Sequence, residues 1–330
     1  MVAPLIVAEI AASHNGSLSR ALEIVDAAYE CGADAVKIQT FTPGTMSVDT
    51  RPIKSGPWAG KTLPQLYAEA QTPWDWHGDI FERCKKHGMI GFSTPFSTHS
   101  VDFLEEFGVE YYKIASFEIT DLDLIRYVAS KGKPVILSTG MATEDEIQEA
   151  VSSAENGKKN FLLKCVSAYP ASIDCCNLAT MSDMRKYGCG VGLSDHTMGG
   201  LAAVVATSLG AEIIEKHLTL RRSDGGPDAD FSAEPHEFAA MVRDCRGAAR
   251  ALGEVSYGPT EDERDSLQFR RGLWAVKDIK KGETITRENV KALRPATGLL
   301  PSQLEVIENK RVIRDVSHGT MISTDMLDSQ

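Results

Sequence analysis

Short apolar runs recur from residue 5 to residue 217, and most of them precede a stretch in which apolar residues follow helical spacing. The clearest of these amphipathic stretches cover residues 19–31, 73–87, 144–155 and 199–209. Apolar runs that alternate with such stretches predict βαβ units and a parallel sheet. The eight runs lie at residues 5–10, 35–40, 90–94, 111–116, 134–139, 161–167, 190–195 and 212–217.

Eight strands spread over about 215 residues favour a closed α/β fold, the (β/α)8 TIM barrel. A doubly wound sheet is the alternative, but no GxGxxG sequence follows the first run, as it would in a dinucleotide-binding fold. The alternation stops near Gly253, where a charged segment with a helical piece begins. We therefore predict a barrel over residues 1–253 and a linker over residues 254–270.

The last part of the chain has a different pattern. Short β-like runs at residues 273–278, 283–286, 290–294 and 312–315 are separated by dipeptides such as Lys281-Gly282 and His318-Gly319. Glycine-containing turns between short runs are typical of compact β structure. We expect a small β-rich domain over residues 271–330.

Polar side chains stand at the carboxyl end of nearly every run in the barrel segment. Active sites of TIM barrels lie at these strand ends, and an apolar core would not select such residues. Side chains two residues apart share a strand face, so Glu215 and His217 are expected to point the same way. The pattern predicts a polar mouth formed by Glu9, Lys37, Gln39, Ser93, Thr94, Lys113, Ser116, Ser138, Thr139, Lys164, Ser167, Ser194, Asp195, His196, Glu215, Lys216 and His217.

Two histidines, His196 and His217, end the seventh and eighth runs and are expected on neighbouring strands. Two imidazoles there could bind one divalent metal ion and leave positions open for water or substrate. The alternative is a pair of histidines with structural hydrogen bonds. Ser194, Asp195 and Glu215 favour the metal site, because neighbouring polar groups orient metal ligands.

Two lysines, Lys37 and Lys113, end the second and fourth runs between apolar neighbours. Each alone could simply extend to the rim of the barrel. Together with Ser116, Ser138 and Thr139 they indicate a pocket for phosphate and carboxylate groups. A barrel lysine can instead form a Schiff base with a keto acid, and the spacing does not distinguish these two roles.

Composition narrows the class of partner and the compartment. The net charge of −11 argues against nucleic acid and anionic membranes, although a local lysine cluster still suits a small anionic substrate. The seven cysteines show no CxxC spacing, which favours a reducing compartment. The segment MVAPLIVAEI has neither a basic stretch nor a cleavage site and is too short to span a membrane. We expect a soluble cytoplasmic protein.

Eight strings of the barrel segment resemble the sialic acid synthase family: IVAEIAASHNGSL, GADAVKIQTF, FSTPF, YKIASFEITD, KPVILSTGMAT, VGLSDHTMG, GAEIIEKHLTL and GGPDADFSAEP. The segment RRGLWAVKDIKKGETITRENVKALRP is similar to the SAF (antifreeze-protein-like) domain that ends these enzymes. LYAEAQTPWDWH, EKHLTLRRSDGGPDADFS and YGPTEDERDSLQFRRGLW are most similar to the pseudaminic acid branch. His14-Asn15-Gly16 and Pro227-Asp228 also resemble the neuraminate and legionaminate branches.

This resemblance implies an enzyme that condenses phosphoenolpyruvate with an N-acetylated amino sugar, with C–O bond cleavage and release of phosphate. It also implies a divalent metal, with Mn²⁺ first and Mg²⁺ or Co²⁺ as alternatives. In the pseudaminic acid branch the acceptor is 2,4-diacetamido-2,4,6-trideoxy-L-altrose. The alternatives are N-acetylneuraminate or legionaminate synthesis, a 3-deoxy-sugar-acid phosphate synthase, and a non-catalytic sugar-binding barrel.

The resemblance also implies roles for single residues. His196 and His217 match manganese ligands, and Glu9 and Glu215 match acidic groups at the site. Arg271 matches an arginine that the SAF domain contributes to the active site of a partner subunit, which implies a domain-swapped homodimer. Lys37 and Lys113 match catalytic groups beside phosphoenolpyruvate, and the residues expected to bind substrate are Gln39, Ser116, Ser138, Ser167, Tyr169, Ser194, Asp228 and Arg271.

Overall fold

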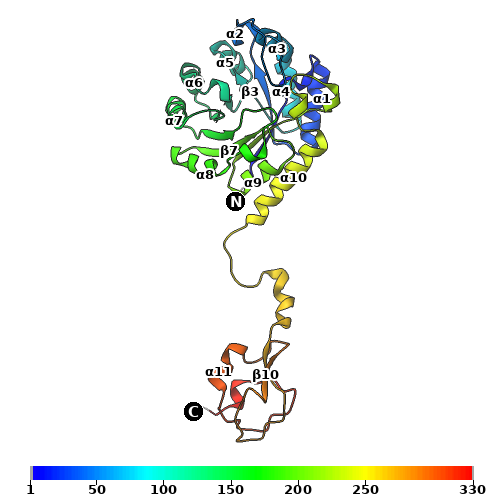
Figure 1. Cartoon of the computed structure of the whole chain (residues 1–330), viewed down its shortest axis with the longest axis vertical. Helices are drawn as coiled ribbons and strands as arrows, with labels where there is room; N and C mark the ends of the chain where they lie inside the picture. Colours follow the sequence, from blue (N-terminus) through cyan, green and yellow to red (C-terminus); the bar gives the residue numbers. More distant parts are fainter. Residues whose placement is uncertain (1–2, 329–330) are drawn as a thin grey trace. The chain divides into compact units, whose positions relative to one another are not determined.

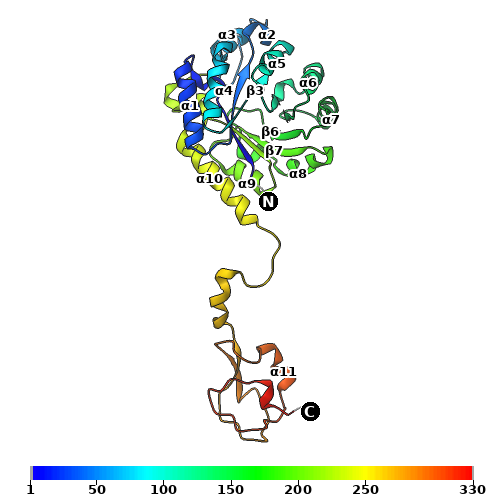
Figure 2. The ribbon, with the colours of Figure 1, turned by 180° about the vertical axis from the view of Figure 1, so that it is seen from behind.

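The computed structural model describes residues 3–328 and divides the chain into two compact units, 1–254 and 255–330. The first unit contains eight parallel strands, and β1 pairs with both β2 and β8, which closes the sheet into a barrel (Figures 1 and 2). The predicted (β/α)8 fold is therefore confirmed. The strands are β1 (Leu5–Glu9), β2 (Ala35–Thr40), β3 (Ile90–Pro95), β4 (Tyr112–Ile114), β5 (Val135–Ser138), β6 (Phe161–Cys165), β7 (Gly190–Asp195) and β8 (Ile213–His217).

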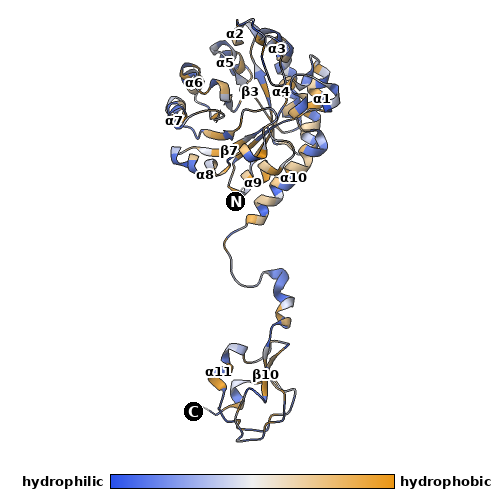
Figure 3. Cartoon of the chain, in the orientation of Figure 1, coloured by the Kyte–Doolittle hydropathy of each residue, from blue (hydrophilic) through white to orange (hydrophobic). Residues whose placement is uncertain are grey.

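The helices of this unit begin where the sequence supplies a capping side chain and bury one apolar face. Ser17 Oγ accepts the Arg20 N–H at 3.3 Å at the start of α1. Along α10, hydrophilic and hydrophobic residues alternate (Figure 3), and Phe238, Met241 and Cys245 lie on the buried face. The helices are α1 (Leu18–Glu30), α2 (Pro43–Met46), α3 (Leu63–Ala70), α4 (His77–Lys86), α5 (Thr98–Glu105), α6 (Leu122–Ala129), α7 (Glu144–Ser153), α8 (Ala179–Asp183), α9 (Leu201–Ser208) and α10 (Pro235–Leu252).

Several predicted strands are longer than the observed ones, by one or two residues at the carboxyl ends of β1, β4, β5 and β6 and by one residue at the amino ends of β4, β5 and β8. Ser116 begins the short 3-10 helix η3 (Ser116–Glu118), and Ser167 lies in the loop after β6. Both residues lie beyond the last backbone-paired residue of the preceding strand. A side chain can face the mouth from this position without its backbone pairing with a neighbouring strand. The connection from β2 to α4 contains α2 and α3, which have no long apolar period and were not predicted.

The second unit has its own small core. A 3-10 helix, η8 (Glu261–Phe269), precedes β9 (Gly272–Ala275), which pairs antiparallel with β10 (Val290–Leu293); a short helix, α11 (Leu304–Ile307), follows. Its buried apolar residues are Leu273, Ala275, Ile279, Ile285, Val290, Leu299, Ile307, Val312, Val316, Ile322 and Leu327. The expectation of a small β-rich domain is confirmed. In neither unit does a helix of the described chain have the length and apolar character needed to cross a membrane.

Candidate active site

Four charged side chains meet at the carboxyl ends of β1, β2, β4 and β8. Lys37 forms an ion pair with Glu9, lies 3.8 Å from Glu215 Oε1, and donates a hydrogen bond to Thr94 Oγ1 at 3.0 Å. Lys113 Nζ donates to Glu215 Oε1 at 3.3 Å. All four charged residues are at most 5% exposed. Two lysines and two carboxyl groups therefore share one buried site, which we call the charge cluster.

The two carboxyl groups of the charge cluster have opposite pKa shifts. Burial raises the pKa of Glu9, and Lys37 offsets this only in part. Burial also acts on Glu215, but Lys113 and Lys37 outweigh it and lower the pKa of that carboxyl. Burial lowers the pKa of Lys113, whereas the carboxylates outweigh burial at Lys37 and raise its pKa. Two neighbouring carboxyl groups whose pKa values are shifted in opposite directions are an arrangement suited to acid–base chemistry.

Some polar atoms around the charge cluster have no hydrogen-bond partner within the protein. Glu215 Oε2 and Ser138 Oγ are buried and unpartnered. Ser194 Oγ donates to the other oxygen of Glu215 at 3.3 Å. Because buried polar groups are nearly always satisfied, these atoms are available to a ligand with acceptor and donor groups.

A glycine brings two of the predicted serines together. The Gly140 N–H donates to Ser116 Oγ at 3.0 Å. A Cβ atom on Gly140 would lie 2.2 Å from Ser167 Oγ and 2.8 Å from Ser116 Oγ. Only a residue without a side chain leaves room for both hydroxyl groups, which therefore form one small polar cradle beside the charge cluster.

The two histidines fit a divalent metal ion. Their ring centroids are 5.5 Å apart, a distance compatible with one ion between them because metal–nitrogen bonds are about 2.0–2.1 Å. His196 Nδ1 donates to the Val166 carbonyl at 3.0 Å, which leaves Nε2 with a lone pair in the neutral ring. His217 Nδ1 is buried without a partner, and burial keeps the pKa of this ring well below its usual value. No cluster of three or more His, Cys, Asp or Glu side chains suited to a metal occurs among residues 3–328, so the protein would contribute the two imidazoles.

Asp195 does not join this site, contrary to the expectation that it orients the histidines. Its Oδ2 accepts a hydrogen bond from Lys216 Nζ at 2.7 Å, and its Oδ1 accepts the Thr197 N–H at 2.9 Å. Asp195 and Lys216 lie one residue from Ser194 and Glu215, so strand alternation turns them to the opposite face. They form a buried structural ion pair behind the mouth.

Ser93 and Lys164 also do not join the mouth, contrary to the expectation. Ser93 Oγ donates to the Ile38 carbonyl at 3.0 Å, and Lys164 Nζ donates to the Cys165 carbonyl at 3.2 Å. Each lies one residue from a side chain that faces the mouth, so strand alternation turns it to the opposite face.

Gln39 and Tyr169 lie beside the charge cluster and the histidines. Gln39 Nε2 donates to Glu9 Oε1 at 3.5 Å, and the Tyr169 ring lies 4.4 Å from the His196 ring. Asp228 Oδ2 accepts the Ala12 N–H at 2.9 Å, and burial raises the pKa of this carboxyl to about 6. Arg271 belongs to the second unit, where it is exposed directly before β9.

Three residues of the mouth were not predicted. Glu118, in η3, has a buried carboxylate oxygen without a partner, and burial raises its pKa to about 7. Glu118 lies two residues after the predicted site residue Ser116, and this spacing could have identified it from the sequence. Trp58 and Phe231 lie close to Tyr169, at ring distances of 5.5 and 4.9 Å. Trp58 comes from a loop and Phe231 from a three-residue 3-10 helix, and neither is long enough to show an apolar period.

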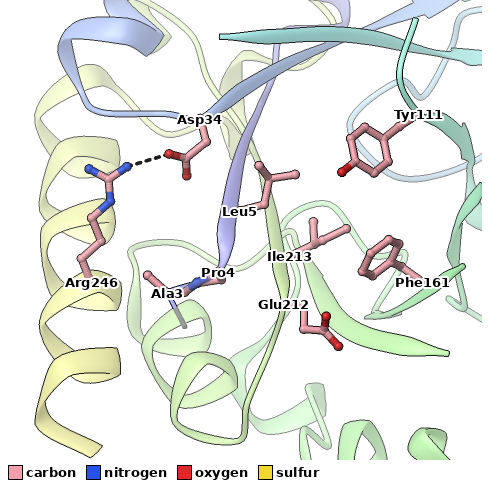
Figure 4. Close-up of a pocket in the computed structure, with 9 residues that line it drawn as sticks. All are labelled: Ala3, Pro4, Leu5, Asp34, Tyr111, Phe161, Glu212, Ile213 and Arg246. Atoms are coloured by element: carbon pink, nitrogen blue, oxygen red, sulfur yellow. Dashed lines mark hydrogen bonds and ion pairs between the residues drawn. The ribbon is translucent and has the colours of Figure 1, made fainter. Parts of the chain in front are cut away.

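A separate cavity of about 420 Å³ lies at the opposite, amino-terminal ends of the strands (Figure 4). Leu5, Phe161 and Ile213 form its apolar part, and the Asp34–Arg246 ion pair of 2.9 Å lies at its side. It contains none of the polar residues of the mouth. Because this end of a TIM barrel serves stability, we do not assign it to catalysis.

Comparisons with known proteins show the family of this chain. The NeuB family model matches residues 24–257, more than half of the chain, and the SAF domain model matches residues 270–328. Pseudaminic acid synthase of Campylobacter jejuni is 42% identical, with 95% of this chain and 94% of that protein covered. N,N'-diacetyllegionaminic acid synthase of the same species is 34% identical, with coverage of 96% and 98%.

Among solved structures, the N-acetylneuraminic acid synthetase of Leptospira borgpetersenii has a TM-score of 0.73 and 32% identity. The match covers 81% of this chain and 91% of that one. The two family models together match both units, and the NeuB match includes β2, β4 and β8, three of the four strands that carry the charge cluster. The chain is therefore a member of the NeuB family that ends in a SAF domain.

Proposed function

We propose that this protein condenses phosphoenolpyruvate with 2,4-diacetamido-2,4,6-trideoxy-L-altrose and water to give pseudaminic acid and phosphate. The observation that carries the proposal is the buried pair Lys37 and Lys113, held within one charge cluster at the barrel mouth. The 42% identity to proteins named pseudaminic acid synthase supports this branch over the legionaminate branch at 34%.

Phosphoenolpyruvate fits the chemistry of the charge cluster. Its phosphate and carboxylate require cations, and the two lysines supply them in a site with little water. The unpartnered Ser138 hydroxyl and the Ser116 hydroxyl beside Gly140 can hydrogen-bond the same oxygens. Bound phosphoenolpyruvate would supply hydrogen-bond partners that the protein itself does not provide.

The acceptor sugar would lie toward the histidines. A divalent ion bound by His196 and His217 would supply Lewis-acid polarisation of the sugar aldehyde. Tyr169 and Asp228 border the same region and would orient the open-chain sugar toward the enol carbon of phosphoenolpyruvate. We propose Mn²⁺ as the physiological ion.

The proposed reaction forms one C–C bond and one C–O bond and breaks the C–O bond to phosphate. C3 of phosphoenolpyruvate attacks the aldehyde carbon, whose oxygen takes up a proton, and water adds to the cationic C2. Loss of phosphate with its bridging oxygen then gives the keto acid. Glu9 and Glu215 are the carboxyl groups beside the lysines that can give and accept these protons.

Isotope labelling and a sugar panel test this proposal. Phosphoenolpyruvate labelled at the bridging oxygen should release labelled phosphate, and borohydride should trap no adduct on Lys37 or Lys113. The diacetamido-trideoxy altrose should have a higher kcat/KM than N-acetylmannosamine or the legionaminate precursor. Label retained in the sugar product would contradict C–O cleavage, and a higher kcat/KM for another sugar would contradict the branch.

We also propose a domain-swapped homodimer. Four apolar side chains that are 45–64% exposed follow four consecutive strands at the barrel mouth: Phe117, Met141, Ile173 and Met198. A clustered apolar rim of this kind favours coverage by protein. We propose that the SAF domain of a second copy covers it and brings Arg271 to the sugar.

Subunit complementation tests the swap. Arg271→Ala should lower kcat/KM about a hundredfold, the effect of removing a charged donor from a desolvated site. A mixture of His217→Ala and Arg271→Ala subunits should regain activity, since one of its two sites then has both groups. No recovery in a proven heterodimer would rule out the swap. The seven cysteines are free, which supports our proposal of a reducing, cytoplasmic location.

A further inference from the structure

Three aromatic side chains from three different loops meet beside the histidines. Trp58 comes from the connection between β2 and α3, Tyr169 follows β6, and Phe231 ends a 3-10 helix after β8. The Trp58 and Tyr169 rings are 5.5 Å apart, Tyr169 and Phe231 are 4.9 Å apart, and Trp58 and Phe231 are 6.3 Å apart. We call these three residues the aromatic wall.

The loop that carries Trp58 holds this side chain inward. Its ends are joined by hydrogen bonds from the Ile53 N–H to the Lys61 carbonyl at 2.8 Å and from the Gly60 N–H to the Ile53 carbonyl at 2.9 Å. Trp58 is half-buried, whereas residues 54–57, 59 and 60 are exposed. The Trp58 indole N–H donates to the Pro227 carbonyl at 2.8 Å. This bond leaves only the apolar ring face of Trp58 for a ligand.

The aromatic wall borders the place where the acceptor sugar would lie. Tyr169 is 4.4 Å from the His196 ring, and Phe231 is 5.1 Å from the His217 ring. Asp228 lies on the same loop as Phe231, between the residue that anchors Trp58 and the wall itself. Phe231 is only 2% exposed, so the half-buried rings of Trp58 and Tyr169 are the part of the wall that is open to a ligand. A polar carboxyl beside these rings suits a sugar that carries both hydroxyl and methyl groups.

We infer that Trp58 and Tyr169, with Phe231 packed against both, select a methyl group of the acceptor sugar over a hydroxymethyl group at the same place. The inference rests on the proposed function. A methyl group gains contact with ring faces, whereas a hydroxyl there loses water without a replacement partner on Trp58 or Phe231. The methyl group can belong to C6 of a deoxy sugar or to an acetamido substituent. An apolar pocket rejects an added hydroxyl by up to about a hundredfold, so we expect a selectivity of tenfold or more.

Two matched substrate pairs test the inference and distinguish these sources. The first pair compares the 6-deoxy sugar with its 6-hydroxy analogue, and the second compares N-acetyl with N-glycolyl substituents. The measurement is the ratio of kcat/KM values within each pair, from phosphoenolpyruvate-dependent phosphate release. This ratio does not depend on the fraction of a variant that is folded. Trp58→Ala and Phe231→Ala should each reduce the ratio at least threefold in one of the two pairs.

Trp74→Ala is the matched control. The Trp74 indole N–H also donates to a backbone carbonyl, that of Phe41 at 3.0 Å, and its ring lies 4.5 Å from Phe103 and 4.9 Å from His99, with no ring contact to His196, His217 or the aromatic wall among the described residues. Its ratios should equal those of the unaltered protein. If neither Trp58→Ala nor Phe231→Ala changes the ratios, the inference is overturned. Phosphate release by the unaltered protein with the diacetamido sugar would still uphold the proposed function. No phosphate release by the unaltered protein with any sugar would overturn both.

Discussion

The two ends of the barrel carry charges in very different ways. At the amino-terminal end, Asp34 and Arg246 pair at 2.9 Å with side chains 37% and 39% exposed. At the carboxyl end, Lys37 and Glu9 pair with side chains 4% and 1% exposed. Exposed pairs contribute about 0–1 kcal/mol, whereas burying an ion costs several kcal/mol that pairing often fails to recover. Stability explains the first arrangement and does not explain the second.

Unpartnered polar atoms sharpen this contrast. Within the described part of the barrel unit, the buried side-chain nitrogens and oxygens without a hydrogen bond all lie in the carboxyl-terminal parts of strands or in the segments that follow them. Glu9 Oε2 is among them but has its ion pair with Lys37. Atoms left open at one end only are explained by a ligand at that end. The others belong to Ser13, Glu118, Ser138, Glu215 and His217.

Loss of the metal site should have the largest effect. We expect exhaustive chelation to abolish turnover and Mn²⁺ to restore it, and His217→Ala to lower kcat/KM by about a thousandfold or more, because a metal contributes several kcal/mol to transition-state stabilisation. Mn²⁺ should raise the Tm of the unaltered protein and not that of His217→Ala, since an ion that binds the native state stabilises it. Full turnover in demonstrably metal-free protein would contradict the metal site.

A lysine substitution at each end compares the two ends directly. Lys113→Met should lower kcat/KM about a hundred- to a thousandfold. The substitution removes a buried cation that would stabilise the negative charge of phosphoenolpyruvate and of the transition state. Lys159, paired with Glu212 at the amino-terminal end, has a side chain 59% exposed. Lys159→Met should leave kcat/KM within twofold. Similar losses in both variants, measured by steady-state kinetics on folded protein, would show that the two ends do not differ in function.

Regular periodicity explains why the barrel and much of its mouth could be predicted. Eight apolar runs correspond to eight strands, and Glu215, expected among the polar residues at their ends, contacts two others of that set, Lys113 and Ser194. The expectation for Asp195 was wrong, because two-residue alternation turns this neighbour of Ser194 to the opposite face. The side-chain direction of a residue next to a strand end follows the alternation of that strand. The local sequence is therefore sufficient to predict which of these residues face the mouth.

Loop residues could not be predicted in this way. Trp58 reaches the mouth through a hydrogen bond to Pro227, 169 positions away, and no local pattern encodes such a contact. The need for glycine at position 140 likewise comes from Ser167, a residue on the next strand's loop. Packing between distant segments determines both features. The placement of Arg271 beside a partner's site remains a prediction.

A pH-dependent effect on stability should follow from Glu118. Burial raises its pKa from 4.5 to about 7, so the folded state keeps a proton that the unfolded chain loses between these values. The unfolding free energy therefore declines as pH rises from 4.5 to 7, by about 2–3 kcal/mol. Glu118→Gln is neutral throughout and should become more stable than the unaltered protein over this interval, with little difference at pH 4.

Urea denaturation at pH 4 and pH 8 measures this difference. The control is Glu110→Gln, since Glu110 is exposed near the amino-terminal ends of the strands. Its unfolding midpoint should follow that of the unaltered protein at both pH values. Equal midpoints for Glu118→Gln and the unaltered protein at pH 8 would mean that burial of the ionised Glu118 carboxyl does not destabilise the fold. Its unpartnered oxygen would then need another explanation.

The smallest expected effect concerns two glycines. A Cβ on Gly140 would approach Ser167 Oγ to 2.2 Å, so Gly140→Ala should turn the hydroxyls of the polar cradle and lower kcat/KM about tenfold, or about 1.4 kcal/mol. Gly247, within α10, has no atom within 4 Å of such a Cβ. Gly247→Ala should instead stabilise the helix by about 0.5–1 kcal/mol without changing kcat/KM. Steady-state kinetics and urea denaturation of both variants give the answer: if Gly140→Ala keeps kcat/KM within twofold, the cradle does not hold substrate, and the open Ser138 and Glu215 atoms must bind the phosphate without it.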